Sequence, residues 1–104
     1  MGASVHEVTT AYWINTFTAI SDEDKLARYI ELAGPAMTGH GGRFLARGNP
    51  AFALEGASPL RTTLIAFPSA EAALAAYRSA EYQAALAVLG GGAEREIRII
   101  EGLE

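Results

Sequence analysis

The sequence contains no cysteine. A disulfide framework, a thiolate metal site and a cysteine nucleophile are therefore excluded. Cysteine usage alone does not fix the redox compartment, and a reducing cytoplasm is the expected location.

Charged residues are also scarce, and the basic ones are scattered. They make up 19% of the 104 residues, with eight Lys and Arg against twelve Asp and Glu, for a net charge of −4. Nucleic acids and anionic membranes attract proteins through clustered basic side chains. We therefore expect neither as a partner.

Long apolar runs are missing too. No window approaches the ~18 consecutive apolar residues of a membrane span, and residues 1–8 lack the pattern of a signal peptide. We predict a flexible tail over residues 1–8 and a single domain over residues 9–104, because a chain of this length supports one core. Half of the residues are hydrophobic, so we expect some apolar surface to meet a second subunit.

The residue pattern predicts four strands and two helical regions. Stretches rich in β-branched and aromatic residues predict the strands, and Ser residues before amphipathic segments predict the helix starts. The expected strands span residues 9–18, 43–47, 61–67 and 94–100, and the expected helices follow Ser21 and Ser69.

Local signals refine the helices. Ser21 is predicted to cap the first helix, with the acidic run Asp22–Asp24 in its first turn. Pro35 has no amide hydrogen, so we expect a kink or a restart there. Ser69 is expected to cap the second helix, and a repeated Ser-Ala-Glu pattern predicts an interruption and a new cap at Ser79.

This β-α-β-β-α-β order predicts a ferredoxin-like α+β fold. Two right-handed crossovers with a hairpin between them give a four-stranded antiparallel sheet with the helices on one face. Whichever apolar strand residues face away from the helices should then be covered by a second copy of the chain. The candidates for this role are Tyr12, Trp13, Ile14, Leu64 and Ile65.

His40 is the candidate general base, because its glycine-flanked loop allows it to face a cleft and its pKa range suits neutral pH. The other interpretation is a solvated histidine that meets the dipole at a helix C-terminus. No metal site is expected, since His40 has no partner at metal-ligand spacing.

Arg47 is a candidate for binding a ligand carboxylate, and it is expected to share a strand face with Arg43. Alternatively, Arg47 forms an ion pair with Glu55 across the hairpin. Glu55 would itself be a base if it were buried.

Tyr12, Tyr77 and Tyr82 are candidates to line a pocket for a small aromatic or lactone-like ligand. Tyrosines of this kind are more often core residues whose hydroxyl reaches solvent or a backbone group. Both interpretations remain open from the sequence.

Several motifs, in this order and spacing, resemble domain-of-unknown-function family 1330 (DUF1330). The chain departs from that family at Gly90-Gly91-Gly92, where relatives usually carry a basic residue. The motifs that carry the resemblance are Tyr12-Trp13-Ile14, Gly41-Gly42-Arg43-Phe44-Leu45-Ala46-Arg47-Gly48, Leu54-Glu55-Gly56, Phe67-Pro68-Ser69, Ala72-Ala73, Tyr77, Ser79, Glu81-Tyr82 and Ile100-Glu101-Gly102.

The resemblance implies a dimeric α+β barrel, in which two ferredoxin-like subunits pack sheet on sheet. That superfamily includes cofactor-independent monooxygenases, lactone isomerases, haem enzymes and ligand-sensing domains, so it implies a fold more specifically than a chemistry.

Two functions follow as expectations, neither with a cofactor. The first is a homodimeric module that binds a small molecule or has a structural role. The second is a cofactor-independent enzyme on a small organic substrate, in which His40 accepts a proton, Arg47 places an anionic group, and Tyr12 or Tyr77 donates to an oxyanion.

Overall fold

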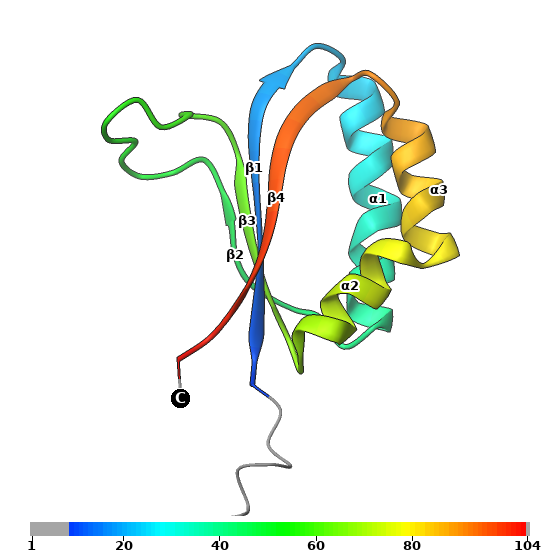
Figure 1. The fold of residues 1–104 in the computed structure, drawn as a ribbon. Helices are drawn as coiled ribbons and strands as arrows, with labels where there is room; N and C mark the ends of the chain where they lie inside the picture. Colours follow the sequence, from blue (N-terminus) through cyan, green and yellow to red (C-terminus); the bar gives the residue numbers. More distant parts are fainter. Residues whose placement is uncertain (1–8, 104) are drawn as a thin grey trace, which may run out of the picture.

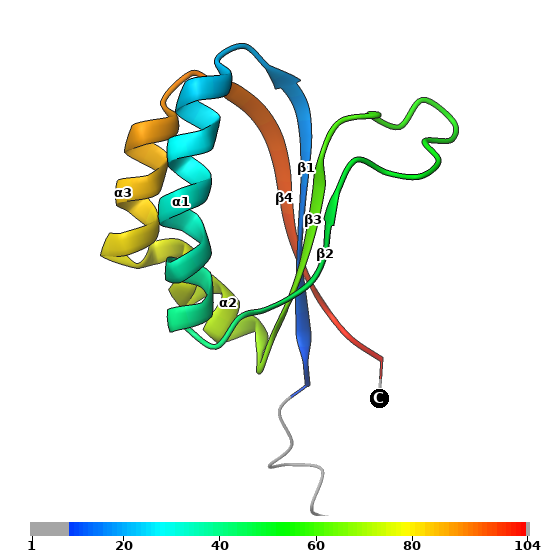
Figure 2. The same ribbon diagram turned by 180° about the vertical axis from the view of Figure 1, so that it is seen from behind.

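The computed structural model describes residues 9–103, so the predicted tail over residues 1–8 lies outside the described residues. One sheet and three helices form two layers, and all three helices lie on the same side of the sheet (Figures 1 and 2). The strands are β1 (Ala11–Ile20), β2 (Arg43–Gly48), β3 (Thr62–Phe67) and β4 (Ala93–Glu101), and the helices are α1 (Glu23–Gly39), α2 (Ala70–Arg78) and α3 (Ala80–Leu89).

The strand order is β2-β3-β1-β4, and every neighbouring pair is antiparallel. β1 and β3 therefore lie at the centre of the sheet, while β2 and β4 form its edges. This arrangement confirms the predicted ferredoxin-like α+β fold.

Alternation along the central strands separates two apolar faces. Trp13 and Ile65 are paired across β1 and β3, are almost completely buried, and belong to the core beneath the helices. Because strand side chains alternate, Tyr12, Ile14 and Leu64 face away from the helices. The outer set of the predicted apolar residues is thus these three, and the inner set is Trp13 and Ile65.

Trp13 lies at the middle of the core. Its ring is 5.4 Å from that of Tyr82, 6.0 Å from that of Tyr77 and 6.2 Å from that of Phe67, measured between centroids. Aromatic pairs at such distances contribute roughly 0.5–1.5 kcal/mol each beyond the burial of their surface. β1, β3 and both C-terminal helices are therefore held together through one indole.

The prediction that Ser21 caps α1 is wrong. The cap is Asp22, whose carboxylate accepts a hydrogen bond of 3.0 Å from the Lys25 amide. Ser21 instead donates its hydroxyl to the Gly91 carbonyl at 3.2 Å, because the backbone amides of both Ser21 and Asp22 are tied to Gly92. This contact with the end of α3 shifts the helix start by one residue.

Of the kink or restart predicted at Pro35, the restart does not occur, since α1 continues through Pro35 to Gly39. The buried residues Ala33, Ala36 and Met37 lie on both sides of Pro35 and pack in the same core. Burial of this continuous apolar stripe outweighs the single hydrogen bond that proline removes.

Both predicted serine caps of the C-terminal helices are confirmed. Ser69 accepts from the Ala72 amide at 3.0 Å, and Ser79 accepts from the Tyr82 amide at 3.1 Å. Ser79 ends α2 and begins α3, so the chain turns there and carries Tyr82 into the core.

The connection between β2 and β3 extends away from the helices (Figures 1 and 2). Phe52 and Leu54 in it are 83% and 72% exposed. It turns at Glu55-Gly56, where both residues have positive φ and the Ala57 amide bonds to the Leu54 carbonyl.

None of the helices in residues 9–103 combines the length and apolarity needed to cross a bilayer.

Candidate functional site

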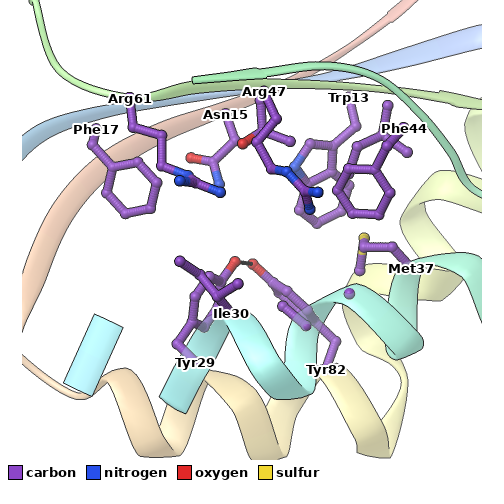
Figure 3. A pocket seen from close by; sticks show the side chains of 14 residues that line it. Trp13, Asn15, Phe17, Tyr29, Ile30, Met37, Phe44, Arg47, Arg61 and Tyr82 are labelled. Atoms are coloured by element: carbon purple, nitrogen blue, oxygen red, sulfur yellow. Dashed lines mark hydrogen bonds between the residues drawn. The ribbon is translucent and has the colours of Figure 1, made fainter. Parts of the chain in front are cut away.

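A cleft lies between the inner face of the sheet and helix α1 (Figure 3). It holds about 40 Å³ of space for water-sized molecules and about 420 Å³ when its open mouth is included. Its apolar walls include Trp13, Phe17, Ile30, Met37, Phe44 and Ile65, and its polar groups come from Asn15, Tyr29, Arg47, Arg61, Thr63 and Tyr82.

A β-bulge brings Arg47 into this cleft. The pairing of β2 with β3 shifts between Phe44 and Ala46, so that Phe44 lies opposite Ile65 and Arg47 opposite Thr63. In a regular strand, residues three apart face opposite sides, but the extra residue of the bulge places both Phe44 and Arg47 on the inner face.

The expectation that Arg43 and Arg47 share a strand face is therefore wrong. Arg43 pairs with Ala66, on the outer alternation of β3. The bulge is the physical reason, because it reverses the alternation once within β2.

Arg47 and Arg61 bring two positive charges to the cleft without a carboxylate. Among residues 9–103, the one ion pair joins Arg98 to Glu96 on the surface. The Arg47 guanidinium carbon lies 5.0 Å from the Phe44 ring centroid. Burial lowers the pKa of Arg61, and the nearby Arg47 charge lowers it further.

Asn15 lies between these two arginines on the sheet side of the cleft (Figure 3). It is 5% exposed, and its Oδ1 is buried without a hydrogen-bond partner in the described structure. Its neighbours along the inner face of β1 are Trp13 and Phe17, and neither donates a hydrogen bond to this oxygen in the described structure.

The helix side of the cleft presents a pair of phenols. The hydroxyls of Tyr29 and Tyr82 are 2.7 Å apart (Figure 3), and Arg95 donates to both of them, to Tyr82 at 2.9 Å. Burial raises the pKa of Tyr82, and the neighbouring Tyr29 raises it further despite Arg95. Tyr82 therefore stays protonated at neutral pH.

The Tyr29–Tyr82 pair has more hydroxyl hydrogens than its own hydrogen bond uses. Two phenols carry two hydroxyl hydrogens, and their mutual hydrogen bond uses one of them. Arg95 has donors only, so it cannot accept the second. One phenolic hydrogen is left without an acceptor among these three side chains.

Two of the predicted site residues, Arg47 and Tyr82, meet in this cleft. Tyr77 lies outside it, beside a second, more open hollow formed with Arg95, Ile97 and Ile99, although its ring packs on Trp13 and Tyr82.

The remaining predicted residues lie elsewhere. Tyr12 is on the outer face of the sheet, and Glu55 is exposed in the β2–β3 connection, with no ion pair to Arg47 in the described part of the chain. His40 follows the end of α1, and its Nδ1 lies 2.9 Å from the Ala36 carbonyl oxygen. His40 does not line the cleft, and its role as a base stays a prediction.

Sequence reasoning missed Asn15, Arg61 and Tyr29. Asn15 carried a usable signal, since it is the one amide on an alternating face that otherwise holds Trp13 and Phe17. Arg61 and Tyr29 carried no such signal. Arg61 lies at the start of a strand and Tyr29 on the apolar stripe of a helix, and both patterns are the same whether or not a cleft lies beside them.

The side chains of the described residues do not gather three potential ligands of a metal ion from His, Asp or Glu. The polar groups of the cleft are cationic, phenolic or amide groups, which suit an organic anion better than a metal cation.

The sequence matches a family described as a domain of unknown function, DUF1330, over residues 10–103. The chain belongs to this family. The resemblance of its motifs is thus confirmed over nearly the whole chain. None of the curated proteins compared with the sequence matches it.

Solved structures share the fold of this DUF1330 protein. A protein of unknown function from Rhodopseudomonas palustris has a TM-score of 0.74 at 16% identity, over 92% of this chain and 84% of that one. A dimeric ferredoxin-like protein of unknown function from Thermobifida fusca has a TM-score of 0.66 at 15% identity, over 91% and 92%.

SnoaB, a cofactor-independent oxygenase from Streptomyces nogalater, has a TM-score of 0.64 at 12% identity, over 93% of this chain and 96% of that one. The same fold thus occurs in an oxygenase and in proteins of unknown function. At these identities the likeness shows the fold alone.

Proposed function

We propose that this protein binds a small, planar organic anion in the cleft between the sheet and α1. The observation that carries the proposal is the pair Arg47 and Arg61, two charges beside apolar walls with no carboxylate partner among the described residues. Burial and the nearby charge of Arg47 both disfavour the charged form of Arg61, and a bound anion would offset both effects.

The other groups of the cleft support the same class of ligand. The partly exposed Phe44 ring offers a flat apolar surface for a planar body, while the guanidinium groups suit a carboxylate. The spare hydrogen of the Tyr29–Tyr82 pair suits an oxygen acceptor. An aromatic carboxylate is the smallest type of molecule that has a planar apolar ring, a negative charge and oxygen acceptors.

Benzoate is a suitable probe, with Arg61→Gln as the test variant. We expect this variant to bind benzoate about tenfold or more weakly than the wild type, because a hydrogen bond to a charged group is worth about 1.5–3 kcal/mol. Isothermal titration calorimetry measures the change. Arg28→Gln removes the same charge from an exposed site on α1 and is expected to leave affinity unchanged.

The ligand-free proteins provide a second readout. Arg61→Gln relieves the repulsion with Arg47, so its free energy of unfolding should equal or exceed that of the wild type. Equal loss of affinity in both arginine variants would indicate a general charge effect. Absence of binding by the wild type would contradict the proposal.

An enzymatic role is the second candidate, supported by the occurrence of a cofactor-independent oxygenase on this fold. In this role Tyr82 or Tyr29 donates to a developing oxyanion. His40, the base that the sequence predicts, lies outside the cleft lining, so it would have to move to reach the ligand. Turnover that is lost in His40→Ala while ligand affinity is kept would support it. Turnover unaffected by that change would exclude His40 as the base.

We also propose that the protein is a cytoplasmic homodimer whose copies pack through the outer face of the sheet. Tyr12, Ile14, Leu64 and Ile100 give that face its apolar character, and the β2–β3 connection extends on the same side, away from the helices (Figures 1 and 2). A dimeric protein of this fold is among its structural neighbours.

Ile100→Glu tests the dimer. Ile100 is 56% exposed in the isolated chain, so the substitution should cost the monomer little while placing a buried, unpaired charge in the interface. Sedimentation should shift from a dimer, twice the chain mass of 11.0 kDa, to a monomer. Leu74→Glu, at a 39% exposed site on α2, should remain dimeric. A monomeric wild type would refute the interface.

A further inference from the structure

Asn15 has a buried side-chain oxygen in the cleft that makes no hydrogen bond in the described structure. Its side chain is more than nine-tenths buried on the inner face of β1, and its Oδ1 has no hydrogen-bond partner within residues 9–103. A buried acceptor without a donor is destabilising, so natural structures retain few of them and they call for an explanation.

A simple carboxylate does not supply the missing partner. A carboxylate has acceptors only, and these match the donors of Arg47 and Arg61. Asn15 Oδ1 requires a donor hydrogen, and the adjacent amide nitrogen of Asn15 is itself a donor. A hydroxyl group meets both requirements, because it donates one hydrogen and accepts through its lone pairs.

We infer that the cleft selects hydroxylated aromatic or enolic carboxylates, with the hydroxyl on the Asn15 amide and the carboxylate on Arg47 and Arg61. The arrangement in Figure 3, with Asn15 between the two guanidinium groups, suits a ligand that carries both groups on one planar frame. This inference rests on the proposed binding of an organic anion in the same cleft.

A bound water molecule is the competing explanation. The free space of about 40 Å³ is sufficient for one, and water also donates and accepts. If water satisfied Asn15 in the complex as well as in the free protein, a hydroxyl on the ligand would bring no advantage. The two explanations therefore differ in ligand preference.

The test compares benzoate with 3-hydroxybenzoate and 4-hydroxybenzoate by titration calorimetry at neutral pH, where the carboxylate is ionised and the phenol keeps its proton. We expect the wild type to bind at least one hydroxybenzoate about tenfold or more tightly than benzoate, because a site built for a hydroxyl penalises its absence. Asn15→Leu, of similar volume, should bind benzoate and that hydroxybenzoate equally. Asn49→Leu removes an exposed amide and should keep the preference.

Equal affinity of the wild type for all three compounds would overturn the inference and leave the proposed anion binding intact. A preference that persists in Asn15→Leu would overturn it as well. If none of the three compounds binds, both proposals fail. Should Asn15→Leu not fold, Asn15→Ala replaces it, and the wild-type comparison decides by itself whether a hydroxyl is preferred.

Discussion

Trp13→Ala is expected to reduce the free energy of unfolding by about 3–5 kcal/mol, the usual cost of truncating a buried Trp or Phe. The indole is 1% exposed and contacts the rings of Phe67, Tyr77 and Tyr82, which come from β3, α2 and α3. Its removal leaves a cavity where the sheet meets both C-terminal helices, and the surrounding rings are too rigid to fill it. Domains are stable by only about 5–15 kcal/mol, so much of the stability should be lost.

Chemical denaturation followed by circular dichroism is the appropriate measurement, because Trp13 is the single tryptophan and its fluorescence disappears with it. Phe52→Ala is the control. Phe52 is 83% exposed in the β2–β3 connection, so its truncation should change stability by no more than about 0.5 kcal/mol. A similar loss in the two variants would show that Trp13 does not organise the core.

The fold was predictable from the sequence because its signals are local. Serines that cap helices and stretches rich in β-branched and aromatic residues each act within a few residues, and their order leaves few topologies. Even the division between α2 and α3 was visible in a second serine, Ser79, whose hydroxyl accepts from the Tyr82 amide.

The candidate site was less predictable, because it depends on strand register. Arg47 faces the cleft only through a bulge that no residue pattern announces, and the same bulge turns Arg43 to the other side. Tyr12 was placed with Tyr82 as a possible ligand contact, yet one residue of alternation separates Tyr12 from the inner face. Spacing along a chain identifies the members of a face and leaves open which face meets the helices.

The two faces of the sheet divide the functions that we propose. The inner face carries the core and, beside α1, the cleft with its unpaired cations and buried amide. The outer face carries Tyr12, Ile14, Leu64 and Ile100 together with the Arg98–Glu96 ion pair, and it lies on the side of the sheet away from the helices (Figure 1). The sheet would therefore separate a second subunit on that face from the cleft. Ligand binding and dimerisation should therefore respond to different substitutions, Arg61→Gln for the first and Ile100→Glu for the second.

Gly42→Ala is the second substitution with a large expected effect, because Gly42 sits where α1 passes into β2. A Cβ atom there would lie 2.8 Å from the Met37 carbonyl oxygen and 2.9 Å from Cζ of Phe67. Neither neighbour can yield easily, since the carbonyl also accepts the Gly42 amide at 2.9 Å and the Phe67 ring is 1% exposed. We expect a loss of about 1–3 kcal/mol in the free energy of unfolding.

Gly91→Ala is the matched control, since a Cβ at Gly91 meets open space. It should be neutral or stabilising by up to about 1 kcal/mol, because alanine restricts the unfolded chain. Gly42→Ala should also weaken benzoate binding, as relief of the clash displaces β2, which carries Phe44 and Arg47 into the cleft. Denaturation and calorimetry on both variants separate these effects, and equal stability of the two would show that β2 accommodates the methyl group without strain.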